Sequence, residues 1–379
     1  MEKIVDKNKC TGCTACMNIC PTGAISMKED NEGFKYPTID QKKCINCGLC
    51  KRTCPVINTS SNESLNESFI GYNKNEEIRL KSSSGGIFSI LANYVLDNSG
   101  IVIGAAFIDN KLKHIAIEKK EYLYKLRSSK YLQSNLEDIF KYIKNNIKNK
   151  KILFTGTPCQ TAGLKAFLKK DYDNLICIDV VCHGVPSPLL FSKYVSELEK
   201  ENNDKLINYD FRDKSKGWTP YLNSAKFKNK TVKTKAIDNP YMKLFLSDVA
   251  LRESCFNCNF KLGNKYSDIT LGDFWGVNNY YPEMNDNKGI SAIIINTEKG
   301  KEIFKNISND IIFKECKLEE IVNGNPSLKY SGKYPTNRKK FFNDFDKYTT
   351  VELSKKYSKK NKLYKKVMRK IKSILIKKR

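Results

Sequence analysis

Short apolar runs alternate with amphipathic stretches along most of the chain. Runs rich in Val, Ile and Phe predict strands, and apolar residues recurring every three or four positions predict helices. The predicted strands are Ile101–Phe107, Lys151–Phe154, Leu175–Val181, Ile269–Leu271 and Ala292–Asn296. The predicted helices are Gly86–Leu96, Leu136–Ile147, Thr161–Lys169 and Leu189–Lys200. This alternation predicts a mixed α/β body over residues 69–350 with a largely parallel sheet, plus antiparallel additions near residues 205–235.

Three other regions lack this alternation. Residues 1–57 hold eight of the fourteen cysteines, and the polar stretch Asn58–Ser68 predicts a linker. In the tail, residues 351–379, apolar residues recur at helical spacing from Leu363 to Leu375, and Lys and Arg fill the other face. Such a basic amphipathic helix suits peripheral contact with an anionic membrane surface. A helix packed on the body, or a solubilising tail, explains the pattern equally well.

The N-terminal cysteines form two runs with the same spacing, C-x2-C-x2-C-x3-C-P, which is typical of bacterial-type [4Fe–4S] sites. Three cysteines two residues apart wrap one cubane, whereas the fourth lies too far round and reaches the other cubane. A pair of zinc knuckles is the alternative, which two identical four-cysteine runs disfavour. We therefore assign one cluster to Cys10, Cys13, Cys16 and Cys54, and a second cluster to Cys20, Cys44, Cys47 and Cys50.

Four further cysteines occupy suggestive positions. Cys159 follows a predicted strand at a helix start, where Thr157 can cap, Pro158 can take the first position and the helix dipole favours a thiolate. Cys182 follows the strand Leu175–Val181, and open α/β sheets place their sites at such carboxyl ends. With the pair Cys255 and Cys258, these residues could hold a third cubane or be buried small side chains. Cys177 and Cys316 are predicted to be core or incidental residues.

Other candidate residues lie in turns and beside strand ends. The turn Ser82–Gly86 opens a helix and could cradle a phosphate, although a flexible turn with a helix cap is an equal alternative. Arg127–Tyr131 offers cations, hydroxyls and a ring, and Gly272–Gly276 places an acid beside a tryptophan. No G-x-G-x-x-G fingerprint occurs. The two histidines are His183, a candidate proton donor beside Cys182, and His114, which is predicted to lie at the surface.

The net charge of +26 changes this picture little. Thirteen Lys and Arg with no acidic residue lie between Lys355 and Arg379, and the remaining excess is spread thinly, as on a solvated surface. No recognition motif accompanies the charge, so nucleic-acid binding is not expected. The charged first residues are unlike a secretory signal, and no apolar stretch is long enough to span a bilayer. A cytoplasmic location is expected, where fourteen cysteines favour metal or redox chemistry.

Several short motifs occur in a characteristic order over about residues 70–330. The series resembles the coenzyme F420 hydrogenase/dehydrogenase beta-subunit family, with a ferredoxin segment fused in front. The motifs are Ser84-Gly-Gly86, Ser129-Lys130-Tyr131, Gly156-Thr-Pro-Cys-Gln160, Cys182-His-Gly184, Cys255-x2-Cys258 and the stretch Ser267–Gly276 that contains Gly-Asp-Phe-Trp-Gly.

The resemblance implies an FAD-binding protein with an additional [4Fe–4S] cluster held by Cys159, Cys182, Cys255 and Cys258. His183 and Asp273 are our candidates for proton transfer. The candidate flavin contacts are Ser84, Gly85, Gly86, Ser129, Lys130, Tyr131, Gly156, Thr157, Pro158 and Trp275. Flavin accepts single electrons from clusters and passes a hydride equivalent onward. The fold class expected is an α+β ferredoxin-like dicluster domain followed by a mixed α/β flavin-binding domain.

The expected function is that of an iron–sulfur flavoprotein oxidoreductase. Its ferredoxin segment has nine basic and six acidic residues, which suits an acidic ferredoxin or flavodoxin as electron carrier. The organic substrate stays open, because similar chains also work near cell-surface polysaccharide synthesis. The alternatives are a non-catalytic electron-transfer subunit and an F420-dependent subunit serving a partner enzyme.

Overall fold

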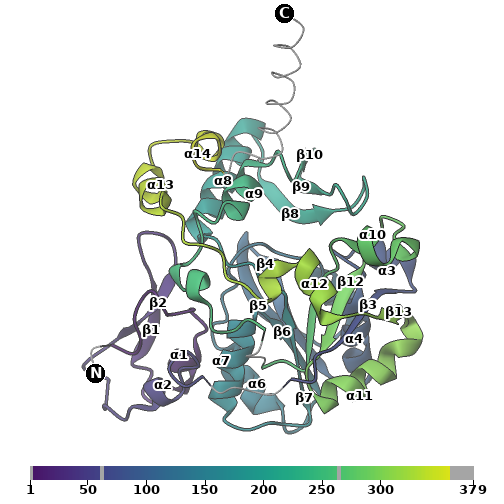
Figure 1. The fold of residues 1–379 in the computed structure, drawn as a ribbon. Helices are drawn as coiled ribbons and strands as arrows, with labels where there is room; N and C mark the ends of the chain where they lie inside the picture. Colours follow the sequence, from purple (N-terminus) through teal and green to yellow (C-terminus); the bar gives the residue numbers. More distant parts are fainter. Residues whose placement is uncertain (1–2, 60–63, 263–265, 359–379) are drawn as a thin grey trace, which may run out of the picture.

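The large sheet of the body has eight strands in the order β13-β3-β12-β11-β7-β6-β4-β5 (Figure 1). The computed structural model describes residues 3–59, 64–262 and 266–358. The four central strands, β4, β6, β7 and β11, are parallel, and the outer pairings are antiparallel. The strands are β3 (Glu67–Asn73), β4 (Ile101–Ile108), β5 (Lys111–Ile117), β6 (Ile152–Gly156), β7 (Leu175–Val180), β11 (Ile269–Asp273), β12 (Ser291–Ile295) and β13 (Ile311–Glu315).

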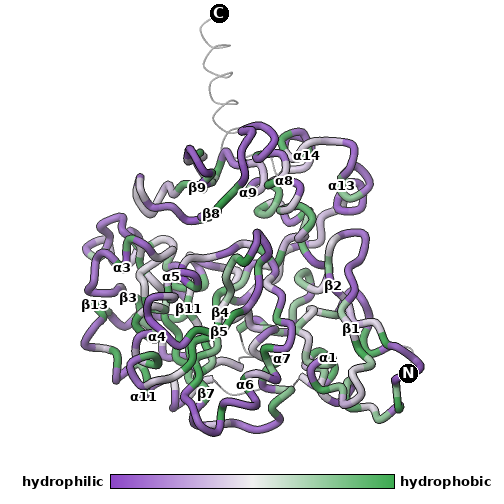
Figure 2. The backbone as a smooth tube through the Cα atoms, turned by 180° about the vertical axis from the view of Figure 1, so that it is seen from behind, coloured by the Kyte–Doolittle hydropathy of each residue, from purple (hydrophilic) through white to green (hydrophobic). Residues whose placement is uncertain are grey.

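Helices cover both faces of this sheet, because successive side chains of its strands point to opposite faces. In β4, Val102 packs in the core cluster with α4 and α11, whereas Ile101 and Ile103 pack in the cluster with α6 and α7. Figure 2 shows the apolar strands at the centre of the body and polar segments around them. The covering helices are α4 (Ile87–Asp97), α6 (Ile139–Asn146), α7 (Pro158–Leu168), α11 (Glu298–Ile307) and α12 (Leu318–Gly324).

The five predicted strands of the body are all present, but β3, β5 and β13 were not predicted. The predicted linker ends too late, because β3 begins at Glu67 and pairs with both β12 and β13. The prediction of a surface His114 is wrong. This residue is buried in β5, where Nδ1 lies 2.7 Å from Ser134 Oγ and Nε2 lies 2.9 Å from the backbone oxygen of Thr155. Burial lowers the pKa of His114 to about 4.

A second, three-stranded sheet confirms the antiparallel additions predicted near residues 205–235. Its order is β10-β9-β8, and it has its own hydrophobic core with Phe191, Tyr241 and Phe341. Figure 1 places this unit beyond the carboxyl ends of the central parallel strands. Its elements are β8 (Leu206–Asp213), β9 (Leu222–Phe227), β10 (Thr231–Lys235), α8 (Pro188–Asn202), α9 (Pro240–Leu246), α13 (Arg338–Asp344) and α14 (Thr350–Tyr357). The predicted amphipathic segment Leu363–Leu375 lies outside the described residues.

The ferredoxin segment packs beside α7 and is anchored on the body (Figure 1). Arg338 forms a bidentate ion pair with Glu32. Ser187 Oγ donates to the backbone oxygen of Glu32 at 2.5 Å. The elements of this segment are α1 (Ala15–Ile19), β1 (Ile25–Glu29), β2 (Lys35–Ile39) and α2 (Leu49–Arg52).

The remaining helices of the body are short. They are α3 (Glu76–Leu80), α5 (Leu123–Leu126), α10 (Val277–Tyr280) and the 3₁₀ helices η1 (Lys120–Tyr122), η2 (Glu253–Asn257), η3 (Pro282–Met284), η4 (Ser308–Asp310) and η5 (Pro326–Leu328). Over residues 3–59, 64–262 and 266–358, no helix is long and apolar enough to cross a bilayer.

Candidate iron–sulfur centres and their surroundings

Two cavities in the ferredoxin segment are each lined by four cysteines. The first ferredoxin site is lined by Cys10, Cys13, Cys16 and Cys54. The second ferredoxin site is lined by Cys20, Cys44, Cys47 and Cys50. These are the two sets that the spacing predicts, with the last cysteine of each run crossing to the other site. In the described part of the chain, no three His, Cys, Asp or Glu side chains are arranged around a single metal ion. Four thiols around a common cavity suit a cubane cluster.

A third cavity brings together cysteines from three distant segments. It holds about 680 Å³ of space free of protein atoms, part of it open solvent. We call it the four-cysteine cavity, and its cysteines are Cys159, Cys182, Cys255 and Cys258. The structure thus gathers the four cysteines that the family resemblance implies as ligands, while Cys177 is buried in β7.

Adjacent parallel strands place two of these cysteines. Cys159 lies in the first turn of α7, directly after β6, and Cys182 follows β7, the neighbour of β6 in the sheet. As predicted, Thr157 is the N-cap of α7 and Pro158 is its first residue. The backbone N–H of Thr157 donates to Gln160 Oε1 at 2.9 Å, which holds this end of the helix.

A backbone ladder brings the other two cysteines to the same cavity. The backbone N–H of Ser187 donates to Ala250, and the N–H of Arg252 donates to Val185. These bonds fix the segment before η2 against the segment after Cys182. Because Cys255 lies in η2, the ladder carries the Cys-x2-Cys pair to the carboxyl ends of β6 and β7.

Two thiols of this cavity, those of Cys159 and Cys255, are poor anions by themselves. Burial and the nearby Cys258 raise the pKa of Cys159, and burial and Cys182 raise the pKa of Cys255 to about 12. Iron in a cubane supplies the positive charge that lets such thiols bind as thiolates. Lys261 adds a further cation, because its Nζ donates to the backbone oxygen of Cys182 at 2.6 Å. The donor set therefore fits a third [4Fe–4S] cluster.

His183 lines the four-cysteine cavity beside Cys182. Its Nε2 lies 2.6 Å from Asp248 Oδ1 and its Nδ1 lies 3.2 Å from Ser327 Oγ. Both ring nitrogens are therefore held, with the ring edge-on to Phe245. This geometry holds the imidazole next to the cavity, where the predicted proton transfer would take place.

The candidate flavin residues separate into two groups. Thr157 and Pro158 line the four-cysteine cavity, and Gly156 directly precedes them. The second group gathers around Arg212, whose Nη1 donates to Tyr131 Oη at 2.9 Å and whose Nη2 donates to the backbone oxygen of Ser83 at 2.9 Å. Of this second group, Tyr131, Asp273 and Trp275 contact Arg212 themselves. The other members lie in the two segments that contain Ser83 and Tyr131, and they are Ser84, Gly85, Gly86, Ser129 and Lys130.

Arg212 is fully buried and was not predicted from the sequence. It donates to both carboxylate oxygens of Asp273, at 2.8 and 3.0 Å, and Trp218 Nε1 donates to Oδ1 at 3.2 Å. Trp218 stacks on Trp275 with ring centroids 4.6 Å apart, and the guanidinium lies over the rings of Trp275 and Tyr221. The buried guanidinium of Arg212 is therefore surrounded by aromatic rings. No pattern in the local sequence distinguishes Arg212 from the many lysines and arginines at the surface.

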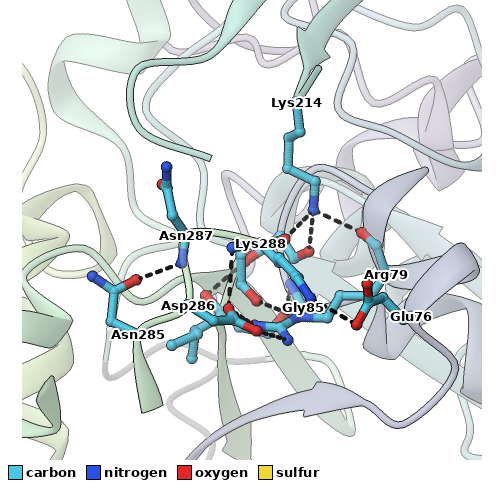
Figure 3. Close-up of polar contacts among 12 residues, drawn as sticks. Glu76, Arg79, Gly85, Lys214, Asn285, Asp286, Asn287 and Lys288 are labelled. Atoms are coloured by element: carbon cyan, nitrogen blue, oxygen red, sulfur yellow. Dashed lines mark hydrogen bonds and ion pairs between the residues drawn. The ribbon is translucent and has the colours of Figure 1, made fainter. Parts of the chain in front are cut away.

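The turn Ser82–Gly86 is braced by protein groups. Ser84 Oγ donates to the backbone oxygen of Ile290 at 2.7 Å, and the N–H of Gly85 donates to Ser291 Oγ at 3.0 Å. Figure 3 shows Lys214 pointing to this turn, where its Nζ donates to the backbone oxygens of Arg79, Ser84 and Lys288. The alternative interpretation, a turn with a helix cap, thus accounts for these polar groups.

Lys130 is likewise held within the protein. Its Nζ donates to the backbone oxygens of Lys125 and Arg127 at 3.1 and 2.7 Å, and burial lowers its pKa to about 7. The N–H of neighbouring Ser129 donates to Ser83 Oγ at 2.6 Å. These contacts connect the Ser129–Tyr131 motif with the Ser82–Gly86 turn, although the two are more than forty residues apart in the chain.

Comparisons with known proteins find matches for two parts of the chain. Residues 149–321 match the family described as the C terminus of the coenzyme F420 hydrogenase/dehydrogenase beta subunit, and residues 9–58 match the 4Fe–4S dicluster domain. A chain of the xenon-derivatised F420-reducing [NiFe] hydrogenase complex from Methanosarcina barkeri is similar at 19% identity and a TM-score of 0.48, with 78% of this chain and 91% of that chain covered. No curated protein matches.

The family resemblance is therefore confirmed over residues 149–321, which contain its motifs from Gly156 to Gly276. The chain is an iron–sulfur electron-transfer protein that is related, through residues 149–321, to the coenzyme F420 hydrogenase/dehydrogenase beta subunit and carries a 4Fe–4S dicluster domain at residues 9–58.

Proposed function

We propose that the protein is an oxidoreductase that carries electrons from a reduced ferredoxin or flavodoxin, through three [4Fe–4S] clusters and FAD, to an organic substrate. The observation that carries this proposal is the gathering of Cys159, Cys182, Cys255 and Cys258 around one cavity. The cavity lies against the first ferredoxin site, since Thr11, between Cys10 and Cys13, also lines it. A third redox centre at this point would connect the ferredoxin segment with the body.

Helix α7 joins the first ferredoxin site to the four-cysteine cavity. Gly163 lies four residues after Cys159, so both residues are on the same side of the helix, about one turn apart. A Cβ atom at Gly163 would lie 2.9 Å from Cys13 Cβ and 3.0 Å from Cys13 Sγ. Glycine therefore lets a ligand of the first site approach the helix that carries Cys159.

The second ferredoxin site faces away from this contact. Its Cys47 is exposed, and neighbouring Ile45 has 64% of its side chain exposed. Exposed cations, including Lys42, Lys43 and Lys51, surround it. Such a surface suits docking of an acidic carrier, so electrons would enter at the second site and leave through the first.

The residues around Arg212 are the part of the body that best suits a flavin. The guanidinium is already paired with Asp273, so it is the partly exposed rings of Trp275, Tyr221 and Tyr131 around it that offer flat surfaces. FAD, when bound, accepts electrons singly and passes them on as a pair. The chain itself would then orient the ring system and exclude water.

A relay subunit is the second candidate function. The matched family is described as a hydrogenase/dehydrogenase beta subunit, which favours a chain that serves a partner enzyme. If the chain acts as the family description states, coenzyme F420 would be the electron acceptor. Binding of flavin distinguishes the two proposals, because a pure relay needs none.

Analysis of the protein purified without oxygen tests the proposal. We expect about twelve irons, as three cubanes require, with matching acid-labile sulfide and one FAD per chain. About eight irons without flavin would remove the third cluster and support the relay.

Replacing Gly163 by alanine is expected to slow electron transfer between the first ferredoxin site and the four-cysteine cavity. The added methyl group would meet Cys13 at 2.9–3.0 Å and push the two sites apart. Electron transfer slows exponentially as the distance between two redox centres grows, so a modest but measurable fall in rate is expected. Rapid-mixing reduction by ferredoxin measures the rate, and magnetic coupling between reduced clusters reports their separation.

The matched control is Ala166→Ser, one turn further along α7 and partly exposed. It should leave both the rate and the coupling unchanged. An unaltered rate and coupling in Gly163→Ala, with full iron content, would contradict the route through α7.

A further inference from the structure

Arg252 is completely buried where the ferredoxin segment meets the body. Its Nε donates to the backbone oxygen of Cys10 at 2.7 Å, Nη2 donates to that of Lys35 at 3.0 Å, and Nη1 donates to Gln133 Oε1 at 3.2 Å. The guanidinium also lies over the ring of Tyr36, 4.2 Å from its centroid. Every acceptor in this set is electrically neutral.

The other buried arginines have a carboxylate partner. Arg79 pairs with Asp286, Arg212 with Asp273, and Arg338 with Glu32. Among residues 3–59, 64–262 and 266–358, Arg252 is the buried arginine without an ion pair. A buried charge without compensation is costly, so its position calls for an anion.

Two anionic groups would lie on either side of this guanidinium. Its Nε donates to the backbone oxygen of Cys10 in the first ferredoxin site. Arg252 also lines the four-cysteine cavity, and it precedes Cys255 by three residues in the chain. A cubane with a 2+ core and four thiolates carries a net charge of −2, and one-electron reduction adds another negative charge. Positive charge next to such a cluster favours the reduced state, since net charge and hydrogen bonding set its potential.

We propose that Arg252 is the counter-cation shared by the first ferredoxin cluster and the cluster of the four-cysteine cavity, and that it raises the reduction potential of both. The role of Arg252 beside the first ferredoxin cluster rests on the dicluster domain. Its role beside the cluster of the four-cysteine cavity rests on the proposed function. The second ferredoxin site is not lined by Arg252 and provides an internal reference.

Potentials measured on the full-length protein test this role. In an anaerobic dithionite titration followed by electron paramagnetic resonance, Arg252→Gln should lower the potentials of the first cluster and of the third. A tenfold fall in the reduction equilibrium constant corresponds to about 59 mV for a one-electron couple. Arg252→Lys keeps the charge and should restore much of the loss, while the second cluster should not move.

Arg338→Gln is the matched control. It removes the ion pair with Glu32, which also anchors the ferredoxin segment, but leaves Arg252 in place. Its three potentials should equal those of the wild type. If Arg338→Gln lowers them as Arg252→Gln does, loosened docking and not charge is responsible, and the proposal is overturned. Unchanged potentials in Arg252→Gln would also overturn it.

A measurement on the wild type keeps the proposal testable if Arg252→Gln does not fold. The first cluster should be reduced at a higher potential than the second, with signals assigned by Cys16→Ser for the first and Cys47→Ser for the second. The reverse order would overturn the role of Arg252. If iron analysis finds only two clusters, the proposal of a third cluster fails. The change in the reduction potential of the first cluster in Arg252→Gln still tests the role of Arg252 separately.

Discussion

Replacing Cys159 by alanine should lower the iron content from about twelve to about eight per chain, as expected for the loss of one cubane. Cys159 is one of the cysteines that line the four-cysteine cavity, and the cavity lining contains no spare cysteine among the described residues. The eight cysteines of the ferredoxin segment lie in separate cavities. Its two clusters should therefore keep their absorption and resonance signals.

The same substitution should abolish electron transfer beyond the ferredoxin segment. Ferredoxin would still reduce the first two clusters, but a flavin bound in the body would stay oxidised on the time scale of the wild-type reaction. Iron and sulfide analysis measures the first effect, and rapid-mixing absorption spectroscopy measures the second.

Cys177→Ala provides the matched control. Cys177 is also a buried cysteine, and it lies in β7, the strand that leads to Cys182, but it packs in the core and does not line the cavity. Its removal should cost stability without changing the iron content. Twelve irons in Cys159→Ala would disprove the third site, and an equal loss of iron in both variants would indicate general destabilisation.

Replacing Asp273 by asparagine should destabilise the body by about 3–5 kcal/mol, the usual cost of breaking a buried ion pair from one side. Arg212 is fully buried, and both oxygens of Asp273 accept its N–H groups, so the substitution leaves a buried cation without a counter-charge. The chain has two tryptophans, Trp218 and Trp275, and they stack beside this pair. Their fluorescence during denaturant unfolding therefore reports on the site directly.

Asp286→Asn is the matched control for this prediction. Asp286 also forms a bidentate ion pair with an arginine, Arg79 (Figure 3). The side chain of Asp286 is 41% exposed, compared with 15% for Asp273. Water can replace the lost charge more readily there, so the free energy of unfolding should fall less. Equal losses in the two variants would contradict the buried character of the Arg212–Asp273 pair. A stable Asp273→Asn protein that fails only in turnover would instead support the predicted proton-transfer role.

Local patterns in the sequence identified much of this protein. The two cysteine runs specify the dicluster segment, because cluster binding depends on residues two and three positions apart. The apolar runs of β4, β6 and β7 predict the parallel centre, since such strands are buried on both faces. The start of α7 is also local, because Thr157, Pro158 and Gln160 act within one turn.

Other features depend on contacts between distant segments. The edge strand β5 alternates charged and apolar residues, so the inward direction of His114 is decided by the partners that Ser134 and Thr155 provide. The first residues of β3 are polar and overlap the predicted linker, and they form a strand because they pair with β12 and β13.

The candidate site likewise depends partly on local sequence patterns and partly on contacts between distant segments. The sequence marks Cys159, Cys182, Cys255 and Cys258 as unusual, but only the order of β6 and β7 and the ladder between residues 185–187 and 250–252 bring them to one cavity. Arg212 and Arg252 carried no signal at all, because a lysine- and arginine-rich chain offers many equivalent cations. Sequence spacing determines interactions within a turn or a strand, whereas burial of a charge and its partners is decided by which distant segments the folded chain packs around it.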